Sequence, residues 1–252
     1  MEVISALSLF RVGRSAMAAH ERSLDVISNN IANVNTTGFG RSRVEFKEVL
    51  EDQAGTDTSG VTADNVRRIW SQGVVRNTGR PLDLAIQGHG FFQIALPDGR
   101  TGYTRDGTFL RASNGALVTA DGYAVVPGLV IPDDATDYRL NPDGTLMVQR
   151  AGADTWTEMG RLQLATFANP EGLEHTGRGI YVAGEASGAA QLAAPGEDTA
   201  GQLVAGAIEE STVDLGEEMV ELITAQRLYA LGLKIVQTAD EMQGLANQLI
   251  GR

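Results

Sequence analysis

Apolar residues recur at helical spacing along the first part of the chain, residues 3–34. One series repeats every seven residues, at Val3, Phe10, Met17, Leu24 and Ile31. A companion series runs through Ala6, Gly13, His20, Ile27 and Val34. Together the two series alternate steps of three and four residues, which is typical of a helix that packs along one stripe against another helix. Residues 3–34 are therefore predicted to form one long helix, and the small residues Ala6 and Gly13 let a second helix come close.

Large apolar residues return at the same spacing near the other end, in residues 215–250. With one threonine, the series is Leu228, Leu231, Ile235, Thr238, Met242, Leu245 and Leu249. Glu217 and Glu218 fall in the first turn of this expected helix, where the helix dipole favours acidic side chains. Ser211 or Asp214 is expected to cap that turn. The pattern thus predicts an amphipathic helix at each end of the chain.

Between these helices the apolar residues follow strand periodicity. Residues 82–87 and 91–96 alternate apolar and more polar positions on either side of the turn Gly88-His89-Gly90, which predicts two strands with one buried face each. Turn dipeptides follow at Asp98-Gly99, Asp106-Gly107, Asn114-Gly115, Asp121-Gly122 and Asp143-Gly144. Because Asp-Gly and Asn-Gly favour two-residue turns of type I′, this spacing predicts a meander of short antiparallel strands.

The expected fold class is α+β, with the long N- and C-terminal helices pairing as a coiled-coil-like stalk and a central, mainly antiparallel β domain. The predicted boundaries are 1–36 for the first helix of an assembly domain, 37–80 for a connector, 81–206 for the β domain and 207–252 for the last helix. The glycine- and alanine-rich run 183–206 is expected to be a loop leading to the last helix. Because both apolar stripes lie at the extreme termini, we expect them to pack against other copies of the chain.

Three asparagines near the end of the first helix, Asn29, Asn30 and Asn33, allow two interpretations. Asn29 and Asn33 lie one turn apart and away from the apolar seam, so their amides are placed to bond another subunit. Alternatively, the asparagines and Gly38 simply end the helix. The residues by themselves favour neither interpretation.

The composition narrows the class of protein. The chain has 252 residues, 42% of them apolar, which fits a folded globular protein. A net charge of −12 argues against nucleic-acid binding, and no apolar run is long enough for membrane insertion. The absence of cysteine excludes disulfides and thiolate chemistry. Glu2 stands where a secretory signal would be basic, so we do not expect a cleaved signal peptide.

The sequence carries no recognisable catalytic motif. Its three histidines, His20, His89 and His175, are isolated in the sequence, with none of the spacings of a zinc site. The turn 88–90 lacks the third glycine and the following helix of a dinucleotide-binding loop. We therefore expect no enzyme activity, no cofactor and no metal.

Three segments of the chain resemble motifs of one family, the axial proteins of the bacterial flagellum. Residues 24–39 (LDVISNNIANVNTTGF) resemble the N-terminal motif of rod, hook and hook-associated proteins. Residues 82–92 (LDLAIQGHGFF) with 103–107 (YTRDG) are similar to the central motif of rod and hook proteins. Residues 225–229 (AQRLY) and 237–242 (QTADEM) are similar to their C-terminal motif. The three motifs stand in the family's order over nearly the whole chain.

This resemblance implies a structural subunit of the basal-body rod that assembles through its terminal helices into a helical tube and transmits motor torque to the hook. It also implies the partners: copies of the chain, other rod and hook proteins, and the flagellar type III export apparatus. The implied location is the rod, where it crosses the periplasm or cell wall. Chain length and residues 160–182 most resemble the distal rod members, but residues 47–72 are shorter than is usual there. The proximal rod paralogue or another rod-type member is therefore the alternative.

The stripes and the asparagines together give a predicted assembly interface. On the first helix it comprises Val3, Phe10, Met17, Leu24, Ile27, Asn29, Asn30, Ile31, Asn33 and Val34, and on the last helix Leu228, Leu231, Ile235, Met242, Leu245 and Leu249. A different class of protein, a self-contained secreted coiled-coil binding module, would use the same helices as a stalk. The two differ in that a rod subunit elongates, whereas a stalk forms a small discrete oligomer.

Overall fold

The computed structural model describes the backbone of residues 2–53, 56–152 and 155–250, and the side chains of residues 9–48, 61–63, 65–152, 155–245 and 248. The chain divides into two compact units. The helical unit comprises Met1–Val34, Arg41–Ile69 and Val213–Arg252, and the β unit comprises Asn35–Gly40 and Trp70–Thr212. The predicted combination of two terminal helices with a mainly antiparallel β region is confirmed.

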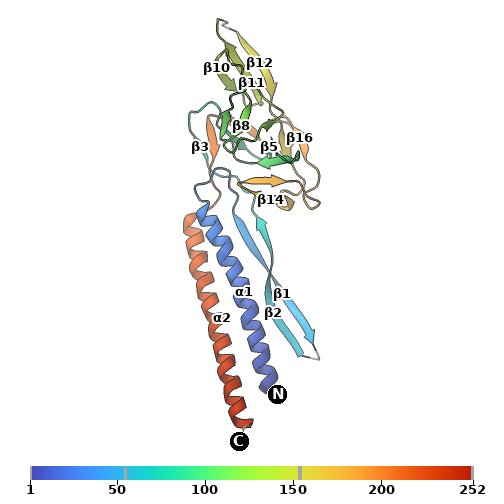
Figure 1. Ribbon diagram of the computed structural model, residues 1–252, viewed down its shortest axis with the longest axis vertical. Coiled ribbons are helices and arrows are strands. Elements are labelled where there is room, and N and C mark those ends of the chain that lie inside the picture. Colours follow the sequence, from blue (N-terminus) through green and yellow to red (C-terminus); the bar gives the residue numbers. More distant parts are fainter. Residues whose placement is uncertain (1, 54–55, 153–154, 251–252) are drawn as a thin grey trace. The chain divides into compact units, whose positions relative to one another are not determined.

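Two long helices, α1 (Glu2–Ala32) and α2 (Leu215–Ile250), lie side by side in the helical unit (Figure 1). Asp214 caps α2, because its Oδ1 accepts a hydrogen bond from the backbone N–H of Glu217 at 3.0 Å. Of the two predicted N-cap residues, Ser211 and Asp214, the structure has Asp214 as the N-cap. At the other helix end, α1 stops at Ala32 and the chain turns at Asn33, whose N–H donates to the carbonyl oxygens of Asn29 and Asn30.

A long antiparallel hairpin completes the helical unit. It is formed by β1 (Ser42–Gln53) and β2 (Thr56–Arg68), and it runs along α1 (Figure 1). A register shift between Glu45 and Phe46 marks a β-bulge, which bends the strand. These residues fall within the connector predicted for 37–80, and they group with the helices. The sequence did not predict this hairpin, because charged and polar residues are frequent in it and apolar residues do not alternate clearly.

The β unit consists of short strands joined by tight turns. A seven-stranded sheet runs in the order β14-β15-β6-β5-β13-β16, with β9 pairing β5, and a three-stranded sheet runs β10-β11-β12. Three further pairs are β4 with β17, β3 with β18, and β7 with β8. The strands are β3 (Val75–Asn77), β4 (Leu84–Gln87), β5 (Phe91–Ala95), β6 (Thr101–Thr104), β7 (Phe109–Arg111), β8 (Leu117–Thr119), β9 (Val125–Val126), β10 (Ala135–Leu140), β11 (Thr145–Arg150), β12 (Trp156–Arg161), β13 (Leu164–Thr166), β14 (Glu174–Gly177), β15 (Ile180–Val182), β16 (Gln191–Ala193), β17 (Gln202–Ala205) and β18 (Ala207–Glu209), with a 3-10 turn η1 (Pro170–Gly172) before β14.

Two hydrophobic clusters lie on opposite faces of β5. Phe92 packs into the larger cluster, where its ring meets that of Phe109 edge to face at 5.0 Å between centroids. Phe91 packs into a second, aromatic cluster, where it meets Trp70 edge to face at 4.7 Å. The expectation of one buried face was therefore wrong for β5, and β4 is likewise buried on both faces. Consecutive apolar residues on a central strand are the sequence sign of such double burial.

The turns follow a different geometry from the predicted type I′. Gly99, Gly115 and Gly144 have φ between 79° and 86°, but among the described non-glycine residues only Arg178 and Asp198 have positive φ. A type I′ turn needs positive φ at both central residues, so this prediction was wrong. The preceding acidic or amide side chain instead accepts the N–H two residues later, as Asp98 does from Arg100 and Asp143 from Thr145.

Two further predictions for the β unit were wrong, the hairpin turn at Asp106-Gly107 and the loop over residues 183–206. Gly107 does not close a hairpin: its carbonyl accepts the N–H of Leu84, and a Cβ at this position would lie 1.7 Å from the carbonyl oxygen of Leu84. The run 183–206, expected to be a loop, contains β16 and β17. Both results arise because partner strands distant in sequence supply the hydrogen bonds.

Candidate assembly interface

One face of α2 packs against α1, and glycine or alanine stands at three of its seven positions. Its buried and half-buried positions follow steps of four and three residues, at Glu218, Leu222, Ala225, Tyr229, Gly232, Val236 and Ala239. A methyl group on Gly232 would lie 2.7 Å from Met17 Cγ, and one on Gly13 would lie 2.8 Å from Val236 Cγ2. The two glycines thus permit a close approach that larger side chains would prevent.

Of the apolar residues predicted on the first helix, Met17 lies at this contact, beside Gly232. Ile27 is buried, and Phe10, Met17, Leu24, Ile31 and Val34 are half-buried. The side chain of Val3 lies outside the described residues. The seam predicted for the first helix therefore takes part, at least in part, in packing within one chain.

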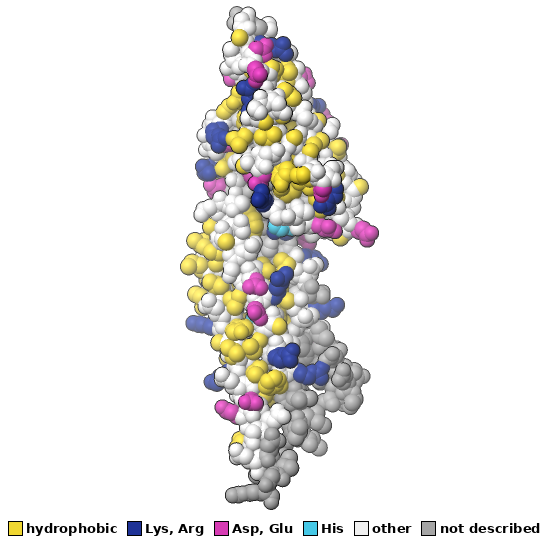
Figure 2. All heavy atoms as spheres, viewed as in Figure 1, with side chains coloured by type: hydrophobic (Ala, Val, Ile, Leu, Met, Phe, Trp, Pro, Cys, Tyr) yellow, Lys and Arg dark blue, Asp and Glu magenta, His cyan; other side chains and the backbone are white. Residues whose placement is uncertain are grey.

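The residues predicted on α2 are exposed in the single chain. We call Leu228, Leu231, Ile235, Met242 and Leu245 the α2 stripe; their exposed fractions run from 39% for Ile235 to 61% for Leu245. The side chain of Leu249 lies outside the described residues. Figure 2 shows hydrophobic side chains gathered along the helical unit on the side of α2. In one chain, the two helices therefore approach closely at Gly13 and Gly232, while the large residues of the α2 stripe remain exposed.

Further large apolar side chains of α2 are exposed. They are Leu215, Met219, Val220, Ile223 and Leu233. Single exposed apolar residues are common on protein surfaces, but the α2 stripe, extended by Val220 and Ile223, places several along one side of the helix, which marks an interaction surface. The exposed apolar residues of α2 are the strongest sign of an interface in the helical unit.

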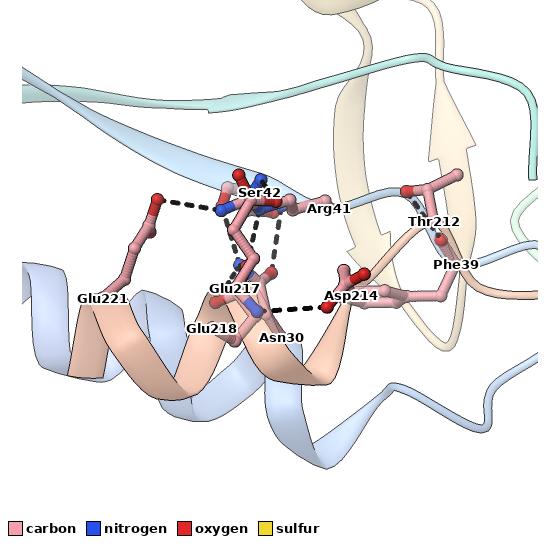
Figure 3. Close-up of polar contacts among 9 residues, drawn as sticks. All are labelled: Asn30, Phe39, Arg41, Ser42, Thr212, Asp214, Glu217, Glu218 and Glu221. Atoms are coloured by element: carbon pink, nitrogen blue, oxygen red, sulfur yellow. Dashed lines mark hydrogen bonds and ion pairs between the residues drawn. The ribbon is translucent and has the colours of Figure 1, made fainter. Parts of the chain in front are cut away.

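A buried polar network joins α1, β1 and α2 next to this surface (Figure 3). The Asn30 amide nitrogen donates to the Ser42 carbonyl at 2.8 Å and to both carboxylate oxygens of Glu218 at 3.2 Å. The Ser42 N–H donates in return to Asn30 Oδ1 at 3.0 Å. Asn30 and Glu218 are both buried, so these bonds replace water for groups that would be costly to bury alone.

Arg41 extends this network to the first turns of α2. Its guanidinium pairs with three carboxylates, with N–O distances of 2.6 Å to Glu218, 2.8 Å to Glu217 and 2.9 Å to Glu221 (Figure 3). Burial by itself would lower the pKa of Arg41, but the three carboxylates raise it above its ordinary value. One cation thus holds the end of α2 against the start of β1.

The predicted asparagines divide between the two interpretations. Asn30 bonds Ser42 and Glu218, and the Asn33 amide donates to the Asn29 carbonyl at 2.9 Å, so both have partners within the chain. Asn29 is exposed. A bond to another subunit remains a prediction for Asn29, while Asn33 helps to end α1.

Two buried ion pairs escaped sequence reasoning. Arg41 and Glu218 are 177 residues apart in sequence, and Arg105 and Glu209 of the β unit are 104 apart. Arg105 Nη1 lies 3.2 Å from Glu209 Oε2, while Glu209 Oε1 accepts the N–H of Gly73 at 2.8 Å. The one local sign was that Glu218 falls in the same helical phase as Leu222 and Ala225.

Over 2–53, 56–152 and 155–250, no three His, Cys, Asp or Glu side chains are grouped to hold a metal ion. No helix in this part of the chain combines the length and apolarity needed to cross a membrane.

Comparison with known proteins gives consistent matches along the chain. Residues 10–39 match the family model described as flagella basal body rod protein. Residues 85–148 match the flagellar hook protein FlgE/F/G D1 domain, and residues 204–249 match the flagellar basal body rod FlgEFG protein C-terminal model.

Individual relatives agree with these models. The flagellar basal-body rod protein FlgG of Caulobacter vibrioides is 43% identical over 96% of this chain and 99% of its own length. The FlgG of Bacillus subtilis is 40% identical over 93% of this chain and 96% of its own. The flagellar hook protein FlgE of Helicobacter mustelae is 44% identical, but over 52% of this chain and 32% of its own length. The rod proteins, unlike the hook protein, match nearly end to end.

Proposed function

Because this chain belongs to the flagellar rod and hook protein family, it is a structural protein of the basal body, and we propose that it polymerises through its exposed helix faces into the rod. The α2 stripe carries this proposal. Its large side chains are about half exposed in the single chain, and burying the exposed part of each would contribute roughly 1 kcal/mol. Repeated along a polymer, such contacts favour assembly over the free chain.

The arrangement of the helical unit suits a shaft that transmits torque. We propose that α1 and α2 pair as a coiled-coil-like stalk through the Gly13 and Gly232 contact, and that the stripe of each stalk packs on neighbouring stalks. Close-packed apolar seams deform little, so a tube of such stalks resists shear. The assembly segments are then 1–36 and 207–252.

The match along nearly the whole length of FlgG supports a position in the distal part of the rod. The chain would there contact other rod and hook proteins, after delivery by the flagellar type III export apparatus. The proximal rod remains the alternative position. A deletion strain distinguishes them: loss of this chain from the distal position leaves a shorter rod without a hook, whereas loss from the proximal position removes the first rod segment.

Assembly of the purified chain tests the proposal directly. Met242→Asp with Leu245→Asp places two charges on the α2 stripe and is expected to abolish polymerisation seen by sedimentation and electron microscopy. Gln237→Asp with Gln243→Asp adds the same charge at exposed polar positions of α2 and serves as the control. A native chain that forms only a small discrete oligomer would contradict the proposal and favour a self-contained binding module.

A further inference from the structure

The exposed apolar residues of α2 fall on two sides of the helix. The α2 stripe occupies one side. Leu215, Met219 and Leu233 are also large and exposed, and at about 100° per residue they lie within about 40° of one another around the helix, off the stripe. We call these three residues the Met219 surface. Met219 and Ile235 of the stripe are sixteen residues apart in sequence, which places them about 160° apart around α2.

The Met219 surface carries no charge. Between Leu215 and Leu233, the other exposed residues on this side of α2 are Gln226 and Ala230. The three glutamates in the first turns of α2 all pair with Arg41 on another side of the helix. Because no ionised group lies on it, the Met219 surface can be buried without leaving a charge unpaired.

The two surfaces flank the contact between α1 and α2 on opposite sides. Gly232 faces α1, and it lies about 60° from Ile235 in one direction and about 140° from Met219 in the other. The stripe is on the side of the hairpin, since Leu228 lines a groove together with Phe46 of β1. The Met219 surface is therefore on the side of the helix pair away from the hairpin.

We propose that the Met219 surface of one copy of this chain packs on the α2 stripe of a second, parallel copy, with Met219 against Ile235. This inference rests on the proposed function and names the two surfaces that meet in it. The sixteen residues between these positions correspond to a displacement of about 24 Å along α2. Because the surfaces lie on opposite sides of α2, a copy that uses one keeps the other free, and the contact repeats without closing.

The same displacement brings opposite charges together at the edge of the contact. Arg227 and Glu241 are exposed, fourteen residues apart in sequence and about 40° apart around α2. A shift of sixteen residues leaves Arg227 of the copy that contributes the Met219 surface about 3 Å along the axis from Glu241 of the copy that contributes the stripe. Lys234 on the same edge comes opposite residues 216–220, which include no cation. Charge and hydrophobicity thus favour the same register.

Cysteine cross-linking tests this pairing, because the chain has no cysteine of its own. The double variant Met219→Cys with Ile235→Cys is oxidised mildly after polymerisation and run on a non-reducing gel. The two positions are about 24 Å apart along one helix, and a disulfide spans only roughly 7 Å between Cα atoms, so every cross-link joins two copies. We expect a ladder of covalent multimers.

The single variants and a displaced cysteine give the matched controls. Each single variant alone should form no cross-link, and an equal mixture of the two should form covalent dimers only. Met219→Cys with Gln237→Cys should give no ladder, because these residues are eighteen apart, or about five turns, and lie on the same side of α2. Dimers without longer products from the Met219 and Ile235 double variant would indicate a closed pair and overturn the repeating contact.

A charge reversal tests the displacement without altering either apolar surface. Arg227→Glu is expected to raise the concentration needed for polymerisation by about threefold to tenfold, and adding Glu241→Arg should restore it. Arg227→Glu with Asp240→Arg has the same net charge as the rescued variant. Residue 240 is turned about 100° from residue 241, so this variant should show no rescue.

Failure of the contact and failure of the proposed function give different results. If the native chain and the double cysteine variant polymerise but no ladder forms, the contact is refuted and the proposed function stands. Should the double cysteine variant not polymerise, the charge reversal decides, and the absence of rescue by Glu241→Arg refutes the contact. If the native chain never polymerises, the proposed function itself fails.

Discussion

The buried carboxylate of Glu218 on α2 pairs with the guanidinium of Arg41, whose Nε lies 2.6 Å from Glu218 Oε1. Glu218 has 0% exposure, so without Arg41 its buried charge would be stabilised mainly by the hydrogen bonds from the Asn30 amide. The pair joins the start of the hairpin to the start of α2 in the helical unit. Its importance for stability can be measured separately from assembly.

Removing the cation should destabilise the helical unit. Arg41→Ala leaves Glu218 buried without its charge partner and is expected to lower the free energy of unfolding by about 3 kcal/mol. Urea unfolding followed by helix circular dichroism measures this loss. Glu45→Ala breaks the exposed pair of Glu45 with Arg67 in the same unit and should cost less than about 1 kcal/mol. Equal effects of the two variants would show that burial gives Glu218 no special role.

Glycine substitutions along the helices should have opposite signs. Gly13→Val places side-chain carbon against Val236 and should lower the free energy of unfolding by about 1–3 kcal/mol. Gly244→Ala meets no atom within 4 Å and should raise it by about 0.5–1 kcal/mol, because alanine is the better helix former. Thermal unfolding of both variants checks the pair. A neutral or stabilising Gly13→Val would contradict the close approach of the two helices.

Acid should weaken the helical unit through His20. Burial lowers the pKa of His20 below its ordinary value of 6.5, so the unfolded chain binds the proton more readily than the folded one. The stabilisation from neutral His20 is therefore present above about pH 6.5 and is lost as the pH falls through the folded pKa. The native chain should lose more stability than His20→Gln between about pH 7.5 and about pH 5. Parallel curves for the two proteins would refute the assignment.

The β unit should depend on Arg105. Its guanidinium pairs with the buried Glu209 and donates from Nη2 to the Gly88 carbonyl at 2.8 Å. Arg105→Ala is expected to lower the free energy of unfolding by about 3–5 kcal/mol, because it leaves the buried carboxylate of Glu209 without its charge partner. Tryptophan fluorescence reports this unfolding, since Trp70 packs in the aromatic cluster. Arg100→Ala, which breaks an exposed pair with Asp98, is the control and should leave the stability of the β unit almost unchanged.

Local periodicity was sufficient for the elements at the ends of the chain. The alternation of three- and four-residue steps identified both helices, and the acidic residues with Asp214 identified where α2 begins. The Asp-Gly and Asn-Gly dipeptides located several tight turns, although the side chain of the first residue, and not a type I′ backbone, forms them. These features depend on neighbours within a few residues, which a sequence displays directly.

The sequence by itself determined that α2 has a large apolar stripe, but the tertiary structure decided which face of α2 meets α1. The helices approach at Gly13 and Gly232, so the small residues Ala225 and Ala239 are buried and Leu231 and Leu245 remain outside. Hydrophobicity by itself predicts that the leucines are buried and the alanines exposed, because a larger apolar side chain gains more from burial. It does not show how closely two helix backbones can approach. The sequence places Glu218 in the same helical phase as Leu222 and Ala225, but it does not show that Arg41 is its partner, because the two residues meet only after the chain has folded.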